Sequence, residues 1–141
     1  MVKNNIEDLK IALKLIKNGR MKKIELAKIL NVTEAAIRKR IEKMEKNRII
    51  LGYRAVVDYK KLGLFSSLTG IDVEPEKLWH VVEKLKSMDK IYSLYLTSGD
   101  HVIIAEVICE SMESLISFHE EISKMEGVKR VCPSVILEVI R

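Results

Sequence analysis

Small and cationic residues cluster at helical spacing between residues 33 and 46. Ile37, Ile41 and Met44 recur at i, i+4 and i+7, which is the spacing of a buried helical stripe. The other faces of this helix carry Ala35, Ala36, Arg38, Lys39, Arg40, Lys43 and Lys46. Long cationic side chains can contact phosphates on both walls of a DNA major groove, and small residues allow close approach to base edges. We therefore predict a recognition helix over residues 34–46 with Thr33 as its N-cap, an ordinary basic surface being the alternative.

A second group of polar residues, Thr97-Ser98-Gly99-Asp100-His101, separates two apolar stretches. The glycine lets a ligand approach the backbone, and the carboxylate of Asp100 can accept a hydrogen bond from an amine. The hydroxyl of Ser98 and the imidazole of His101 can hydrogen-bond to a carboxylate. These five residues therefore predict a site for a small effector such as an amino acid. Because Gly-Asp is also a common turn pair, a plain turn is the alternative.

The sequence contains no recognisable catalytic motif. His119-Glu120 has no second histidine at helical spacing, and neither a Gly-rich phosphate loop nor a Gly-x-Ser-x-Gly motif occurs. Cys109 and Cys132 match no zinc-binding spacing and do not form a disulfide scaffold. We therefore expect no enzymatic activity, no cofactor and no metal site. His119 falls on the apolar stripe of its helix, so we expect it to be a hydrogen-bonded core residue.

Charge is distributed unevenly along the 141 residues. Residues 1–60 contain 16 Lys and Arg against seven Asp and Glu, a net charge of +9, whereas residues 61–141 contain nine against 13, a net charge of −4. This asymmetry predicts an N-terminal half that binds a polyanion and a C-terminal half with another role. No apolar stretch approaches the ~20 residues of a membrane helix, and the N-terminus lacks the apolar region of a signal peptide. We expect a reduced, soluble, cytoplasmic protein without membrane contacts.

The first half has the pattern of a winged helix-turn-helix, which we place at residues 1–57. We expect helices over residues 6–17, 22–30 and 34–46 and wing strands over residues 49–51 and 53–58. Gly19 should end the first helix and Asn31 the second, because both residue types tolerate positive φ. The wing carries Arg54, which we expect to contact DNA.

The second half changes to strand periodicity after a linker at residues 58–65. We expect strands over residues 66–73, 91–97, 102–109 and 131–140 and helices over residues 76–88 and 112–125. The order βαββαβ is that of a ferredoxin-like domain, here residues 66–141, with strand order 4-1-3-2. In that order Pro133 lies on an edge strand, as its missing N–H requires, and Cys109 and Cys132 are too far apart for a disulfide. The fold class is α+β.

Two of these strands are apolar on both faces, at residues 102–105 and 135–137. The helices of a ferredoxin-like domain cover only one face of its sheet, so another surface must cover the other face. A second copy of the chain is the simplest candidate. We therefore expect at least a homodimer, with Ile104 and Ile136 in the interface.

The chain resembles the Lrp/AsnC (feast/famine) transcriptional regulators over nearly its whole length. The N-terminal matches to family motifs are Asp8, Ile11, Leu15, Arg20, Glu25-Leu26-Ala27, Thr33, Ile37, Arg40 and Met44. The later matches are Ile50, Gly52, Tyr53, Ala55, Leu62-Gly63-Leu64, Gly99-Asp100 and Gly127-Val128. The family usually has Gly where this chain has Arg48, so we expect Asn47 to take the left-handed conformation one residue earlier. It often has an acid where this chain has Val102, which weakens the expectation of an unmodified amino acid as effector.

The resemblance implies a transcriptional regulator that binds double-stranded DNA and whose binding or assembly responds to a small effector near the hairpin. It also implies that dimers assemble into tetramers or octamers. A set of sirohaem decarboxylases is similar to the same two-domain layout and represents the enzymatic alternative, but the predicted wing contains no histidine. A third alternative is an effector-binding or assembly protein without DNA affinity, against which the charge of +9 argues.

Overall fold

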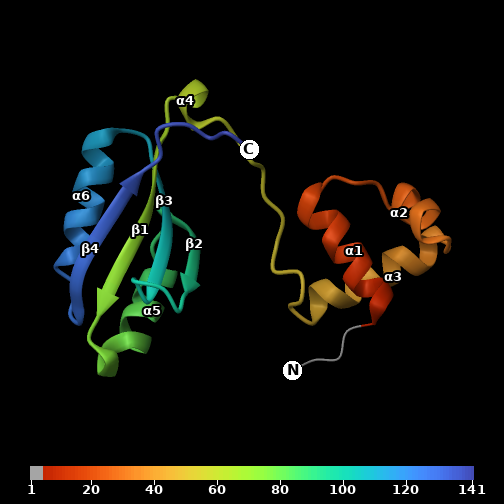
Figure 1. Ribbon diagram of the computed structural model, residues 1–141, viewed down its shortest axis with the longest axis horizontal. Helices are drawn as coiled ribbons and strands as arrows, with labels where there is room; N and C mark the ends of the chain where they lie inside the picture. The colour runs from red at the N-terminus through yellow and green to blue at the C-terminus, as the bar shows by residue number, and fades with distance from the viewer. Residues whose placement is uncertain (1–4) are drawn as a thin grey trace. The chain divides into compact units, whose positions relative to one another are not determined.

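The computed structural model describes residues 5–141, and the chain divides into two compact units, Met1–Val56 and Val57–Arg141 (Figure 1). The helices are α1 (Ile6–Lys17), α2 (Lys23–Leu30), α3 (Glu34–Lys46), α4 (Tyr59–Leu62), the 3₁₀ helix η1 (Pro75–Lys77), α5 (Leu78–Lys86) and α6 (Met112–Ser123). The strands are β1 (Phe65–Val73), β2 (Ile91–Leu96), β3 (Ile103–Cys109) and β4 (Val128–Val135). None of the helices in the described part of the chain reaches the length and hydrophobicity that a bilayer crossing requires.

The three helices of the N-terminal unit begin and end at polar residues. The side chain of Asn5 accepts a hydrogen bond from the Glu7 amide at 3.0 Å and so caps α1. The prediction that Gly19 ends this helix is wrong, because Asn18 is the C-cap and its N–H donates to the Lys14 carbonyl. Asn31 ends α2 in the left-handed conformation with φ 54°, as predicted. The left-handed conformation of Asn31 turns the chain away from the axis of α2, and α3 begins three residues later at Glu34.

The buried side chains of this unit come from all three helices. They are Ile11, Leu26, Ala27, Ile37, Ile41 and Met44. The predicted stripe of α3 is therefore its inner face, and the burial of these side chains supplies most of the stability of so small a unit. The opposite side of α1 stays apolar and exposed, with Ile6 and Ile16 more than two-thirds accessible.

The chain leaves α3 differently from our prediction. Asn47 has φ −85°, and Arg48 is the residue with positive φ, at 58°. The expectation for Asn47 is wrong because its N–H still donates to the Lys43 carbonyl and so holds it near the helical conformation. The amides of Ile49 and Ile50 then both donate to the Met44 carbonyl, which places Ile50 against the core.

The predicted wing strands are not formed, because residues 49–58 contain no strand in the structure. A strand needs a neighbour for its backbone N–H and C=O groups, and no ladder pairs this segment. Its apolar side chains at Leu51 and Val56 are 70% and 79% exposed. The extended conformation of this segment was predictable, but its pairing was not.

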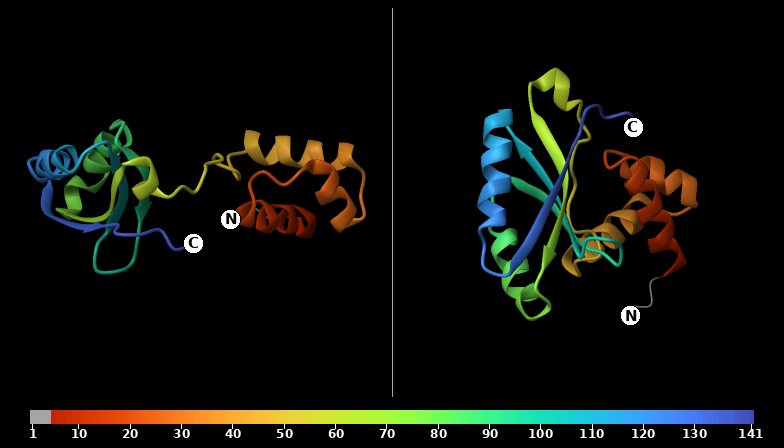
Figure 2. Two further views of the ribbon diagram at one scale, coloured as in Figure 1. Left: turned by 90° about the horizontal axis from the view of Figure 1, so that it is seen from above. Right: turned by 60° about the vertical axis from the view of Figure 1, so that its left-hand side comes forward.

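The C-terminal unit is an antiparallel sheet in the order β2-β3-β1-β4, which confirms the predicted order 4-1-3-2. Both long helices, α5 and α6, cover the same face of the sheet (Figures 1 and 2). Thr69 of β1 pairs with Ala105 on one side and with Pro133 on the other. Pro133 therefore lies on an edge strand, where its missing N–H disrupts no ladder.

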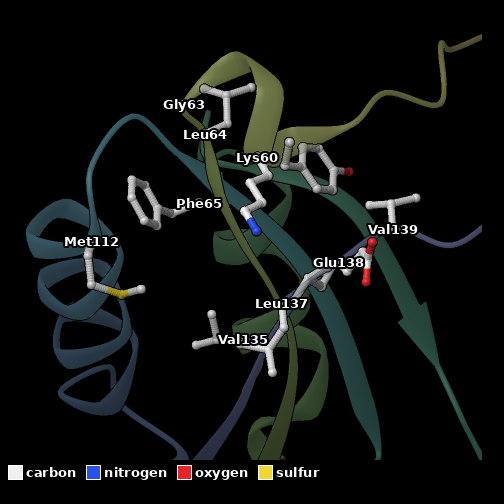
Figure 3. Close-up of a pocket in the computed structure, with 11 residues that line it drawn as sticks. Lys60, Gly63, Leu64, Phe65, Met112, Val135, Leu137, Glu138 and Val139 are labelled. Carbon is white, nitrogen blue, oxygen red and sulfur yellow. The ribbon is translucent and has the colours of Figure 1, made fainter.

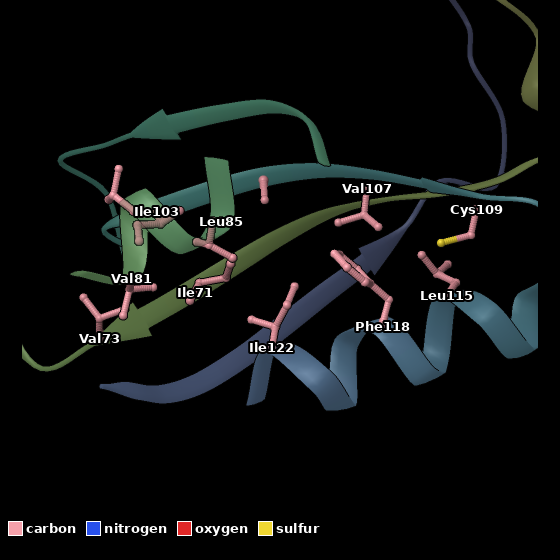
Figure 4. Close-up of a cluster of buried hydrophobic side chains, with 12 residues drawn as sticks. Ile71, Val73, Val81, Leu85, Ile103, Val107, Cys109, Leu115, Phe118 and Ile122 are labelled. Carbon is pink, nitrogen blue, oxygen red and sulfur yellow. The ribbon is translucent and has the colours of Figure 1, made fainter. Parts of the chain in front are cut away.

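The core of this unit lies between the sheet and the two helices (Figure 4). It contains Ile71, Val81, Leu85, Ile103, Val107, Cys109, Leu115, Phe118 and Ile122, among others. Burial alternates strictly along β3, so its odd-numbered residues face the helices and its even-numbered residues face the open side of the sheet. The second face of β3 is left partly exposed by the chain's own helices, as expected: Ile104 and Ile108 are half-buried there, with Glu106 between them.

Several element boundaries also differ from the prediction, and two of the differences change the end of the C-terminal unit. The last strand ends at Val135 rather than Ile140, because its partner β1 begins at Phe65 and provides one further acceptor, the Ser66 carbonyl that binds the Ile136 amide. The segment predicted as a linker contains α4, which is capped at its start by the Asp58 side chain. Gly63 closes this short helix at φ 69°.

Candidate DNA-binding surface and ligand-binding domain

The N-terminus of α3 is fixed by its cap and by the core beneath it. The hydroxyl of Thr33 accepts a hydrogen bond from the Ala36 amide at 3.1 Å. Ile37 is fully buried in the core. The first turn of the helix is therefore fixed by the Thr33 cap at its start and by the packing of Ile37 at its end. The predicted DNA-contacting residues of α3 therefore project from a rigid element, whereas Arg54 belongs to a segment without helix or strand.

The outer face of α3 has a shallow hollow where the side chains are small. It is lined by Ala35, Ala36, Arg38 and Lys39, with Glu42 as its one acidic residue. Lys43, one turn further along, lines a second hollow between α3 and the start of α1, together with Lys39, Arg40 and Asp8. Small, cationic and acidic side chains thus share this face of α3, and the assignment of the face to DNA binding stays a prediction. Such a surface can receive a polyanion without burying a charge away from solvent.

The two arginines of α3 have acidic neighbours. Arg38 forms an ion pair with Glu34 at 3.1 Å, and both side chains remain about half exposed. Arg40 is shielded: its Nη2 lies 2.5 Å from Glu7 Oε2, and its Nη1 lies 3.2 Å from Asp8 Oδ1. Glu7 and Asp8 belong to α1, so Arg40 ties α3 to α1 rather than projecting from the exposed face. Arg54 lies in the extended segment after α3.

The predicted effector hairpin connects β2 to β3. The Thr97 hydroxyl donates to the His101 carbonyl, and the Thr97 amide donates to the Val102 carbonyl at 2.9 Å. Ser98, Gly99 and Asp100 form the exposed tip of the hairpin. The backbone of the turn is therefore fixed at its base, while its tip is open to solvent.

The His101 side chain turns away from the hairpin tip and lies on the open face of the sheet. Its Nδ1 is 3.0 Å from Asp72 Oδ1 on β1. Its ring covers Gly70, where an added Cβ atom would lie 2.3 Å from His101 Cδ2. Gly70 thus has to lack a side chain for the imidazole to reach Asp72. The five residues predicted as one effector site divide into an exposed tip and a histidine docked on the sheet.

His119 confirms the prediction of a hydrogen-bonded core histidine. Its Nε2 lies 2.9 Å from Ser67 Oγ and 3.0 Å from Thr69 Oγ1, and these two hydroxyls are 2.7 Å apart. Burial between α6 and β1 lowers the pKa of His119 below its usual value, because the protonated ring is poorly solvated there. Cys109 and Cys132 are both free thiols, as predicted.

A cavity of about 240 Å³ lies at the end of the C-terminal unit where α4 and the tail after β4 meet (Figure 3). Its lining includes Tyr59, Lys60, Phe65, Met112, Val135, Leu137 and Val139. Sequence analysis did not identify this cavity, because two of its walls are segments that we expected to be linker and strand. Its lining is mainly apolar, with Lys60 and Glu138 as the charged groups.

Two family models cover most of the chain. Residues 8–50 match a winged helix-turn-helix DNA-binding domain, and residues 66–141 match the Lrp/AsnC ligand-binding domain. The second match alone spans more than half of the sequence, and the two matches correspond to the two structural units.

Individual proteins agree with the family models. The chain is 43% identical over 129 residues to the HTH-type transcriptional regulator LrpA of Pyrococcus abyssi, covering 90% of this chain and 92% of that protein. It is 42% identical over 135 residues to LrpA of Pyrococcus horikoshii, with coverages of 94% and 96%. The structure of AsnC from E. coli superposes with a TM-score of 0.67 at 27% identity, covering 99% of this chain and 96% of that one. The chain therefore belongs to the Lrp/AsnC family of transcriptional regulators, with a DNA-binding helix-turn-helix followed by a ligand-binding domain.

Proposed function

We propose that this regulator binds operator DNA through the outer face of α3 and that residues 1–57 form the DNA-binding domain. The observation that carries the proposal is the shallow hollow on α3, which is lined by Ala35 and Ala36 together with Arg38, Lys39 and Glu42. In this arrangement the alanines approach base edges, and the cationic side chains, together with Lys43, contact phosphates on the groove walls.

The remaining residues of the surface have supporting roles. Thr33 fixes the helix N-terminus that enters the groove, and Arg54 reaches the DNA backbone from the segment after α3. We assign Arg40 as a positioning residue, since its contacts to Glu7 and Asp8 hold α3 against α1. Its charge therefore contributes to DNA binding through the orientation of the helix.

We further propose that the open face of the sheet is the dimer interface. Leu68 and Tyr95 are 47% and 59% exposed on this face, with the half-buried Ile104 between them. Glu106 is the acid beside them, and it accepts hydrogen bonds from Tyr59 and Ser93, so its oxygens are already satisfied. A second sheet can therefore cover the apolar side chains without leaving this carboxylate without partners.

The same interface involves the segment after β4. The amide of Ile136 donates to the Ser66 carbonyl, which keeps its half-buried side chain beside the open face. Dimers joined in this way present two α3 helices and bind a pseudo-palindromic site with half-sites spaced by whole turns of DNA. Further association of dimers gives tetramers or octamers.

The effector is a small molecule such as an amino acid, and residues 66–141 are the domain that binds it. At the exposed hairpin tip, Gly99 lets the effector approach the backbone and Asp100 offers a carboxylate beside Ser98. Thr97 and His101 fix the base of the hairpin. We propose no catalytic role for these residues. The protein acts on DNA in the cytoplasm, and the effector changes its DNA affinity or its assembly.

Salt-dependent DNA binding tests the assignment of α3. The DNA is a duplex selected from a random pool by the unmodified protein, and binding is measured at several salt concentrations. Each lost phosphate contact reduces the slope of log affinity against log salt by about 1. The variant Lys39→Ala/Lys43→Ala should therefore bind more weakly at low salt, with a slope reduced by about 2.

A matched control removes two lysines from another surface of the same chain. Lys84 and Lys86 lie on α5, in the C-terminal unit, and both are exposed. Lys84→Ala/Lys86→Ala should leave the salt slope unchanged. Equal losses in the two double variants would show that net charge, and not the face of α3, determines DNA affinity, and the proposal would then be rejected.

A further inference from the structure

Three side chains with different donor atoms meet on the open face of the sheet. Asp72 comes from β1, His101 from the end of the β2–β3 hairpin and Cys132 from β4. One potential ligand atom from each residue lies within 4.8 Å of the other two, and this is the one group of its kind found among residues 5–141. All three residues are half-buried, so their donor atoms are partly shielded from water.

The backbone holds each of these side chains in place. Asp72 pairs with Arg130 across the β1–β4 ladder, and Gly70 pairs with Cys132, which places Cys132 diagonally beside Asp72 on the same face. The His101 ring lies over Gly70, in space that any side chain at that position would fill. The Thr97 hydroxyl binds the His101 carbonyl and fixes the backbone from which the ring projects.

We propose that Asp72, His101 and Cys132 form a binding site for a transition-metal ion of the Zn²⁺ class. A thiolate, an imidazole and a carboxylate are the donors that Zn²⁺ binds in proteins, whereas Mg²⁺ and Ca²⁺ require oxygen donors. Bond lengths of about 2.0–2.3 Å place tetrahedral donors about 3.3–3.8 Å apart. Asp72 Oδ1 and His101 Nδ1 are 3.0 Å apart, and Cys132 Sγ lies within 4.8 Å of a ligand atom of each, at most about 1 Å beyond the tetrahedral spacing.

Three protein ligands leave the fourth tetrahedral position for water or an incoming group. That coordination is typical of exchangeable rather than closed structural sites. All three residues belong to the C-terminal unit, and metal binding is measured by absorbance, so it can be followed without DNA.

Arg130 occupies the position of a competing cation. Its Nε donates to Cys132 Sγ at 2.9 Å and lies 3.4 Å from Asp72 Oδ2. In the single chain the Arg130 side chain is 67% exposed and lies on the edge strand β4, so it can rotate outward past the edge of the sheet when a metal ion arrives. A metal ion and the Arg130 guanidinium therefore compete for the same two side chains, Asp72 and Cys132. Removing the guanidinium should strengthen metal binding, which a purely structural ion pair would not predict.

Co²⁺ titration of the untagged, full-length protein tests the site directly. Tetrahedral Co²⁺ absorbs in the visible region, and a bound thiolate adds a charge-transfer band in the near ultraviolet. The unmodified protein should show both signals with one Co²⁺ per chain, and added Zn²⁺ should remove them. Cys132→Ser and His101→Gln should each weaken binding by at least ~10-fold. Arg130→Gln should bind more tightly than the unmodified protein.

Cys109→Ala is the matched control, because Cys109 is a buried thiol on the opposite face of the sheet. It should retain the charge-transfer band, and thermal unfolding would verify that each variant is folded. The proposal is overturned if Co²⁺ gives no tetrahedral spectrum, or if the thiolate band persists in Cys132→Ser. Weaker binding by Arg130→Gln would refute the role of Arg130 as a competitor. Because absorbance is the readout, failure here would leave the proposed DNA contacts unaffected.

Discussion

Replacement of Arg48 by glycine should stabilise the N-terminal unit. Arg48 follows α3 with φ 58°, a conformation in which the Cβ atom of an L-residue crowds the backbone. Its side chain donates a long hydrogen bond of 3.5 Å from Nη1 to the Leu51 carbonyl on an exposed surface. Arg48→Gly therefore removes the steric cost and loses little else.

The expected gain follows from two opposing effects. The left-handed conformation costs a residue other than glycine about 1–2 kcal/mol. Glycine in turn costs about 0.4–1 kcal/mol, because the unfolded chain gains conformational freedom. The difference between these two ranges is about 0–1.6 kcal/mol, and its midpoint of ~0.8 kcal/mol corresponds to a rise in Tm of roughly 3–6 °C for a unit of this size.

Two probes can separate the two units during unfolding. The single tryptophan, Trp79, is in the C-terminal unit and reports on that unit through fluorescence. Far-UV circular dichroism also follows the three helices of the N-terminal unit. Arg48→Gly should raise the dichroism transition and leave the Trp79 transition unchanged.

The neighbouring residue provides the matched control. Asn47 has φ −85°, so Asn47→Gly relieves no strain and should lower stability. A third variant, Asn31→Gly, should have a smaller effect than Arg48→Gly, because asparagine tolerates φ 54° better than arginine does. If Asn47→Gly stabilises the protein and Arg48→Gly does not, the left-handed residue has been assigned to the wrong position.

Two further predictions concern the C-terminal unit. Ile104→Glu should convert dimers to monomers, as measured by light scattering, because it puts a charge on the open face of the sheet. Trp79→Glu, on the exposed side of α5, is the control and should leave the dimer intact. A monomeric unmodified protein would contradict the proposed interface. The pKa of His119 is lower in the folded state than in the unfolded state, so the folded protein should be most stable above about pH 6.5 and should lose stability as the pH falls. His119→Gln should flatten that decline in urea unfolding measured between pH 5 and 8, and an unchanged pH dependence would show that another group causes it.

The helices of the N-terminal unit could be predicted because their signals are local. The predicted ranges of α1 and α3 agree with the structure, since apolar residues at helical spacing and capping residues such as Thr33 lie within one short segment. The left-handed backbone conformation of Asn31 could also be predicted from its residue type. Arg48 was not, because residue type favours Asn47 and only the hydrogen bonds at the end of α3 decide between them.

Pairing with other segments explains the predictions that failed. Residues 49–58 have an extended pattern, but an extended segment becomes a strand only when another strand bonds to it. The tail after Val135 has the same pattern and lies beyond the end of its partner β1. The sequence shows that Ile104 and Ile136 are apolar residues on the second face of their strands, but it does not show which surface covers them.

The same reasoning separates the two candidate sites. The DNA-binding surface comes from one helix, so a 3.6-residue period is enough to bring Ala35, Lys39 and Lys43 onto one face. Asp72, His101 and Cys132 are about thirty residues apart from one another in sequence, and no short-spacing motif can join them. They meet because the β1–β4 register pairs Asp72 with Arg130, and a shift of one residue would turn Cys132 to the helix-covered face. A metal site of this kind is therefore a property of strand register, and spacing rules that find zinc sites within one loop cannot detect it.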